Sequence, residues 1–212
     1  MYGIMIDELN VMPESPYAEA PELNLTDAYI DLLTTSGPAD LTKYLPADLK
    51  EDSRFRTNVG TMVLNTDKQI TIQSEGVRIG NLVVTGNNRN PDGGAAVTDK
   101  KVGLFDNIVL LGCNLTFTNY EKRPGKPAIG TLYVSNRGLD YEEIIDIIKS
   151  SGDPLQELLE ENGRKAVEDV QVPYYITLNY TNIDNVRYSA GIPEPNLVKN
   201  NDTVLLGTIE AF

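Results

Sequence analysis

Carboxylates are the most numerous side chains in this sequence that could do chemistry. Aspartates and glutamates number 31 against 18 lysines and arginines, while histidine is absent and cysteine occurs once. A glycosidase would need two carboxylates at about 5 Å or about 8 Å from each other. The candidates in predicted strands or loops are Glu75, Asp92, Asp106 and Asp184. No spacing singles out a pair among them, so the sequence assigns no catalytic residue, and we predict that the protein is not an enzyme.

The missing residue types exclude several kinds of site. Without histidine, a Ser-His-Asp or Cys-His catalytic set cannot form within one chain, and metal sites lose their commonest ligand. Cys113 alone can form neither an intramolecular disulfide nor a thiolate zinc site, and its apolar surroundings predict a buried, inert thiol. A Ser-Lys pair, a threonine nucleophile or carboxylate acid–base chemistry stays open. We predict no metal-binding residue, no cofactor-binding residue and no cofactor.

Two loops have compositions that could bind an ion or a partner. The segment 86–94 is rich in glycine and asparagine, but it lacks the Gly-Lys-Ser/Thr ending of a phosphate-binding loop, and no helical pattern follows it. Its oxygens could hold calcium, although the regular aspartate spacing of a calcium loop is missing. The basic turn at Lys122, Arg123 and Lys126 is expected to be exposed, where it could meet the acidic helices of an adjacent copy.

The net charge of −13 repels nucleic-acid phosphates, so a sequence-specific nucleic-acid partner is not expected. The acidity either keeps the protein in solution or provides an acidic surface past which DNA could slide. The first residues lack a basic region, and no stretch approaches the roughly 18 apolar residues that span a bilayer. We therefore expect no signal peptide, no transmembrane segment and no membrane partner.

Residues 1–57 differ in pattern from the remainder. Prolines interrupt short apolar clusters, and Thr26 is expected to cap a brief helix that includes Asp27 to Leu33 and is stopped by the pair Gly37-Pro38. Pro46 could open another short helical turn. These clusters are too apolar for a disordered tail. They predict an extended N-terminal arm that either wraps its own domain or reaches onto a neighbouring subunit.

From Val59 onward, alternating apolar residues predict strands. The segments 59–64, 70–72 and 77–85 have the pattern of a three-stranded meander, with a β-bulge at Gly80. Two helices with strong capping signals follow, one behind Asp140 and one behind Asp153. Further strands are expected at 108–118, 129–135, 174–181 and 203–210.

The expected fold is α+β and β-rich: an antiparallel sheet or sandwich with an inserted helical hairpin at about 140–163 and an extended N-terminal arm. The expected organisation is an arm with short helices over 1–57 and a β-rich domain over 58–212.

The proline-rich arm, the β-rich body over 59–209 and the apolar C-terminus from Leu205 to Phe212 together resemble virion structural proteins of tailed bacteriophages. The resemblance covers connector-ring, tail and auxiliary capsid subunits in general and includes no motif that carries over a functional residue. It implies a structural subunit located in the virion and assembled in the host cytoplasm. Its partners would be other copies of itself and neighbouring virion proteins. The interface residues that we predict are Ile4, Ile6, Leu9, Tyr29, Leu32, Lys122, Arg123, Lys126 and Phe212.

Two other functions remain open. A carbohydrate- or protein-binding β-domain would be a monomer with an exposed tyrosine patch, for which Tyr175 is a candidate. A carboxylate-dependent hydrolase would hold an acid with a strongly raised pKa in a concave pocket.

Overall fold

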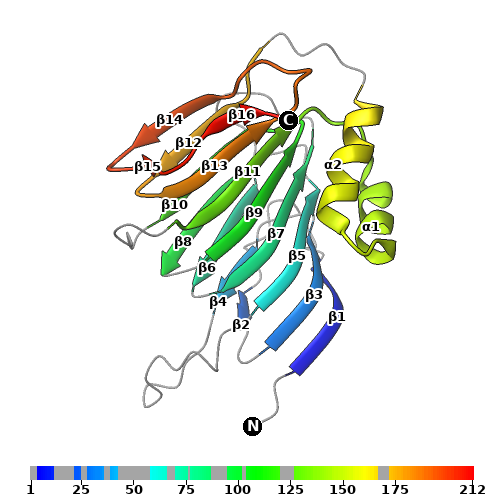
Figure 1. Cartoon of the computed structure of the whole chain (residues 1–212). Coiled ribbons are helices and arrows are strands. Elements are labelled where there is room, and N and C mark those ends of the chain that lie inside the picture. Colours follow the sequence, from blue (N-terminus) through cyan, green and yellow to red (C-terminus); the bar gives the residue numbers. More distant parts are fainter. Residues whose placement is uncertain are drawn as a thin grey trace.

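A computed structural model of the chain describes residues 4–11, 22–24, 28–35, 39–42, 58–65, 70–75, 77–86, 95–101, 104–119, 127–166 and 172–212. Two parallel sheets dominate the fold, and strands that follow one another in the chain alternate between them, except the last two, which both belong to the larger sheet (Figure 1). Each strand inside a sheet pairs with the strand one coil earlier and the strand one coil later, and every pairing among the described residues is parallel. The chain therefore winds as a parallel β-solenoid.

The larger sheet, here called sheet A, has the order β1-β3-β5-β7-β9-β11-β13-β15, with β16 also paired to β13. Its strands are β1 (Ile4–Val11), β3 (Ala28–Thr35), β5 (Asn58–Asn65), β7 (Arg78–Thr85), β9 (Leu104–Leu111), β11 (Ile129–Ser135), β13 (Asn182–Tyr188), β15 (Val204–Leu205) and β16 (Ile209–Ala211). Sheet B has the order β14-β12-β10-β8-β6-β4-β2. Its strands are β2 (Glu22–Asn24), β4 (Ala39–Thr42), β6 (Ile70–Glu75), β8 (Ala95–Lys101), β10 (Leu115–Asn119), β12 (Tyr175–Asn179) and β14 (Asn196–Asn200).

The main core lies between the two sheets. Inward-facing apolar residues stack in columns, since parallel pairing in register puts equivalent positions of successive coils side by side. One column of sheet A contains Ile30, Val59, Ile79, Phe105, Ile129 and Ile183. Sheet B contributes Leu115, Phe117, Ile176 and Leu178 to the same core. All ten of these side chains are buried.

The prediction of an antiparallel sheet or sandwich is wrong. The strands of the predicted meander, β5, β6 and β7, do not pair in sequence: β5 pairs with β7 in sheet A, while β6 lies in sheet B. Apolar alternation marks a strand with one buried face and carries no information about the direction of its neighbour. The predicted bulge at Gly80 is wrong, because β7 stays in register with β5 and β9 on both sides of this residue, although Ile79 and Leu82 both face the core.

The short helix predicted behind Thr26 is also wrong, because Ala28–Thr35 form β3. Ile30 and Leu33 are fully buried in the main core, where in-register neighbours on β1 and β5 stabilise the strand. Tertiary packing here overrides a weak local helix signal. The described strands of the predicted N-terminal arm, β1 to β4, lie within the two sheets.

The inserted helical hairpin has the predicted caps. Helix α1 (Tyr141–Ser150) begins behind Asp140 with a complete capping box, and α2 (Pro154–Lys165) begins behind Asp153 with Pro154 in its first turn. Both helices pack on the outer face of sheet A (Figure 1). The second core that they form with the sheet consists of Leu32, Val63, Val83, Val109, Leu111, Leu139, Ile144 and Leu158. Within the described residues, no helix is long and apolar enough to cross a membrane.

Candidate ligand-binding site

The outer face of sheet A changes from aliphatic to aromatic and charged side chains where the helical hairpin ends. Val63, Val83 and Val109 occupy one outward column and lie under the helices. The same column continues through Tyr133 on β11 and Arg187 on β13, followed by Glu210 on β16. The sheet therefore presents an aromatic ring, a guanidinium and a carboxylate in register beside α2.

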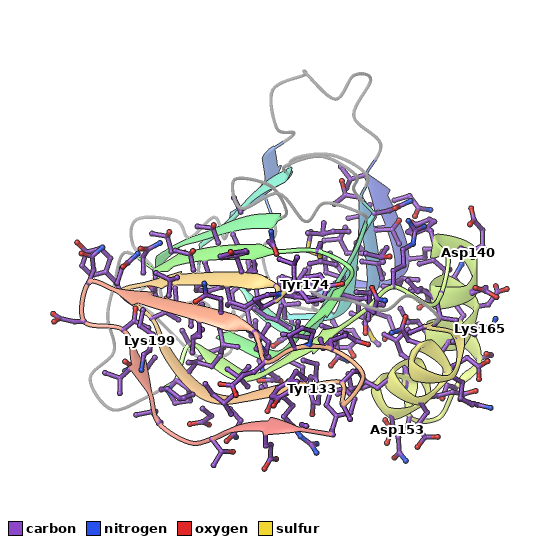
Figure 2. The ribbon with its side chains drawn as sticks, turned by 90° about the horizontal axis from the view of Figure 1, so that it is seen from above. Tyr133, Asp140, Asp153, Lys165, Tyr174 and Lys199 are labelled. Atoms are coloured by element: carbon purple, nitrogen blue, oxygen red, sulfur yellow. The ribbon has the colours of Figure 1, made fainter. Side chains whose placement is uncertain are left out.

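A cavity of about 720 Å³ lies over this row, and we call it the α2 pocket. This volume is in the usual range for small-molecule sites. Leu155, Leu159 and Gly163 line it from α2, and Tyr133 and Arg187 line it from sheet A. Figure 2 shows Tyr133 on the sheet and Asp153 at the start of α2. The remaining lining residues are Ser135, Asn136, Asp153, Gln156, Glu160, Arg164, Ala166, Ser189, Ala190, Gly191, Ile192 and Phe212.

Two aromatic rings and one guanidinium form a fixed cluster at the floor of the α2 pocket. The rings of Tyr133 and Phe212 meet edge to face, with centroids 5.9 Å apart. The guanidinium of Arg187 lies 6.0 Å from the Tyr133 centroid and 5.5 Å from that of Phe212, both within cation–π range. Phe212 is held by two backbone bonds: its N–H donates to Tyr188 at 2.9 Å, and its carbonyl accepts from Ala190 at 3.2 Å.

The amide of Asn162 fixes α2 at this position. Asn162 is fully buried, and its Oδ1 accepts from the N–H of Gly138 at 2.8 Å and of Leu139 at 3.2 Å. Its Nδ2 donates to Ser135 Oγ at 3.0 Å and to the Asn136 carbonyl at 2.8 Å. The amide thus makes four hydrogen bonds, its full usual capacity.

This network extends beneath the α2 pocket. The Oγ atoms of Ser135 and Ser189 lie 2.9 Å apart, and the Tyr174 hydroxyl donates to Asn136 Oδ1 at 3.0 Å. Tyr174 is buried, so this bond satisfies a hydroxyl that would otherwise be costly to bury. The wall and the floor of the pocket are therefore joined by one connected set of hydrogen bonds.

The charges that line the α2 pocket are largely balanced. Arg187 Nε lies 3.3 Å from Glu210 Oε1, and Arg164 pairs with Glu161 on α2. Of the two lining carboxylates, Glu160 accepts from the side chain of Gln156 at 2.8 Å. Asp153 caps α2. An uncharged ligand with many hydrogen-bonding groups suits this pocket better than an ion does.

Polar ladders run along the outer faces of both sheets. On sheet A, Asn107 Nδ2 donates to Asn81 Oδ1 at 3.0 Å, and Thr131 and Asn185 continue the same column. On sheet B, Asn179 Nδ2 donates to Thr118 Oγ1 at 3.1 Å, and Asn200 donates to Asn179 Oδ1 at 3.3 Å. Thr131 and Asn185 stand two residues before Tyr133 and Arg187, so the first ladder borders the row at the floor of the α2 pocket.

A second cavity of about 340 Å³ lies at the other side of the hairpin, between α1 and strands β1, β3 and β5. Asp7, Glu8 and Asp31 line it, and Lys149 Nζ pairs with Glu8 at 2.7 Å. The Lys149 ammonium lowers the pKa of the Glu8 carboxyl through this bond. Among the described residues, no group of three carboxylates or thiols could hold a metal ion.

In comparisons with known proteins, no family model, no curated protein and no solved structure matches this chain. The site is therefore interpreted from its own residues.

The predicted interface residues are spread over the solenoid. Ile4 lies in β1, and Ile6 and Leu9 pack half-buried against the main core. Leu32 is buried beneath the hairpin, whereas Tyr29 is 42% exposed. Phe212 packs on Tyr133 within its own chain. Lys122, Arg123, Lys126 and the loop over 87–94 lie outside the described residues.

Several other predicted residues can be placed. Asp106 forms an ion pair with Arg78 at 2.7 Å. Asp184 lies in β13 and Glu75 in β6, whereas Asp92 lies outside the described residues. Cys113 is fully buried, as predicted, and burial raises the pKa of its thiol to about 12.

Phe212, a predicted interface residue, lines the α2 pocket, but the sequence did not indicate that the residues lining this pocket form a site. Tyr133 and Arg187 are far apart in the chain, and only the parallel register brings them together. Asn162 carried a usable signal, since it stands four residues after Leu158 on the apolar side of α2. A polar residue at such a position is expected to bond to something buried.

Proposed function

We propose that this protein binds a neutral oligosaccharide in the α2 pocket and acts as a binding domain without chemistry of its own. The observation that carries the proposal is the contact between the half-buried Tyr133 ring and the exposed Phe212 ring, beside hydroxyl, amide and charged groups already engaged within the protein. A sugar ring has apolar faces that pack on aromatic rings and a rim of hydroxyls that exchange hydrogen bonds. This was one of the two functions that the sequence left open beside a structural role.

The test is isothermal titration with malto-, cello-, xylo- and manno-oligosaccharides of two to six units. We expect at least one series to bind, and Tyr133→Ala to weaken that binding by about tenfold, because a buried stacking surface is lost. Tyr29→Ala is the matched control, since Tyr29 is an exposed tyrosine of the same sheet outside the pocket. Absence of binding by all four series, or an equal loss in both variants, would contradict the proposal.

We propose as a second function that the chain is a structural subunit of a larger assembly, with a phage virion as its location and neighbouring virion proteins as its partners. The last coil of the solenoid supports this role. Large apolar side chains are exposed there, namely those of Tyr180, Val198, Val204 and Leu206, at 37% to 45%. Several large apolar side chains left exposed on one coil at the end of a solenoid are the feature expected of a protein–protein contact surface.

The mass of the protein in solution tests the second function. Light scattering at several concentrations should give a mass that rises above that of one 23.4 kDa chain. A mass of one chain at every concentration would contradict a subunit that assembles with itself.

A further inference from the structure

We propose that copies of this protein associate head to tail, so that β1 of one copy pairs with β15 and β16 of the next and sheet A continues across the junction. This inference goes beyond ligand binding, and it stands whether or not the α2 pocket takes a sugar. The partner to which it commits is a second copy of the same chain.

The two edge strands of sheet A, β1 at one edge and β15 with β16 at the other, lie on opposite sides of the molecule (Figure 1). Within the described residues, β1 pairs only with β3, and β15 and β16 pair only with β13. An edge strand presents a row of backbone N–H and C=O groups toward solvent and is a template for another strand. Because all pairings in the sheet are parallel, the two edges run in the same direction, as a further parallel pairing requires.

The apolar columns of the core reach both edges at the same positions. One inward column starts with Ile6 on β1 and ends with Leu205 on β15. Another starts with Leu9 and ends with Ile209 on β16. All four side chains are only partly buried, although they pack against the main core. A head-to-tail junction would place Ile6 next to Leu205 and Leu9 next to Ile209, which completes both columns.

The exposed apolar residues of the two edges also match. Met5 is 78% exposed and Val204 is 42% exposed, and each stands one position before the first inward column. They are therefore the two ends of one outward column. The same junction brings Met5 of one copy beside Val204 of the next and removes both from water.

The interface is heterologous, because it joins two different ends of the chain. Such contacts build open filaments, or rings where the rotation closes. The net charge of −13 on each copy opposes the contact through repulsion, and added salt screens that repulsion. Association should therefore strengthen as the salt concentration rises.

The first measurement is sedimentation velocity of the full chain over a wide range of concentrations, in low and in high salt. We expect the average mass to rise with concentration, and to rise further in high salt. A single-chain mass under all of these conditions would overturn the proposal.

Two variants decide how the copies are joined. Met5→Lys blocks only the β1 end, and Val204→Lys blocks only the other end, so that the two blocked ends also repel each other. Each variant alone should self-associate at least about tenfold more weakly than the natural chain, because a charge would be desolvated in the junction. Mixed in equal amounts, they should form a 1:1 dimer that grows no further, since each supplies the natural end that the other lacks.

Val172→Lys is the matched control, because Val172 is 61% exposed and lies in neither edge strand. It should associate like the natural chain. A symmetric junction between two C-terminal ends would leave Met5→Lys fully able to dimerise, and that result would overturn the proposal. Circular dichroism of each variant checks that the fold is retained. An oligosaccharide titration on the same samples reports on the α2 pocket separately.

Discussion

Replacement of Asn162 by alanine should destabilise the protein by about 3 kcal/mol. The side chain is fully buried, and its loss leaves the N–H groups of Gly138 and Leu139 without their partner. Each buried donor without a partner costs about 1–3 kcal/mol, and local relaxation recovers part of the sum. Since a domain of this kind is stable by about 5–15 kcal/mol, this loss is a large share of the total.

Urea unfolding followed by circular dichroism measures this free energy of unfolding. Asn196→Ala is the control, since Asn196 is an exposed asparagine on β14, and its replacement should change stability by less than about 0.5 kcal/mol. Asn162→Asp is a second variant. It keeps both acceptor bonds and loses both donor bonds, so it should be at least as damaging as alanine because it buries a carboxylate. A loss below about 1 kcal/mol in Asn162→Ala would refute the conclusion that this amide holds α2 on the solenoid.

Further predictions concern other parts of the fold. Gly163→Ala should stabilise the protein by about 0.5–1 kcal/mol in the same urea assay, because an added Cβ meets nothing within 4 Å and alanine favours a helix. Gly80→Ala should destabilise it by about 2 kcal/mol or more, because its Cβ would lie 2.6 Å from a backbone carbonyl of the preceding coil; a neutral result would contradict the close stacking of the coils. Lys149→Met should lower the urea midpoint at neutral pH. Because the pKa of Glu8 is lowered in the folded protein, the stability that the Lys149–Glu8 ion pair adds is present above the unfolded pKa of 4.5 and is lost as the pH falls through the folded pKa. The urea midpoints of Lys149→Met and of the unchanged protein should therefore converge in acid. The Cys113 thiol, with its pKa of about 12, should not react with a thiol reagent in the native protein and should react only after the protein is unfolded in urea. Rapid labelling of the native protein would show that the core opens around Cys113.

The elements with local signals were predictable from the sequence. Both helix starts carry capping residues, Asp140 with Glu143 and Asp153 with Pro154, and these act within one turn of chain. The strand predicted over 174–181 was likewise found, as β12 (Tyr175–Asn179), since alternation depends on the backbone alone.

The arrangement of the strands was not predictable, because the pairing partners lie one coil apart. Ile79 pairs with Phe105, whereas Ile129 pairs with Ile183 across the inserted hairpin. These separations are unequal, so no repeat shows in the sequence, and the usual sign of a solenoid is missing. The α2 pocket was missed for the same reason, since Tyr133 and Arg187 meet only through this register.

The position of the hairpin on sheet A has a consequence for the order in which the molecule opens. In a solenoid each coil contacts only its neighbours, so local unfolding starts at the ends and moves inward one coil at a time. Helices α1 and α2 pack across Leu32, Val63, Val83 and Val109, and thereby bind four successive coils together. Those coils must open as one cooperative unit. Amide protons of β5, β7 and β9 should then exchange with solvent last, and those of β14 and β16 first.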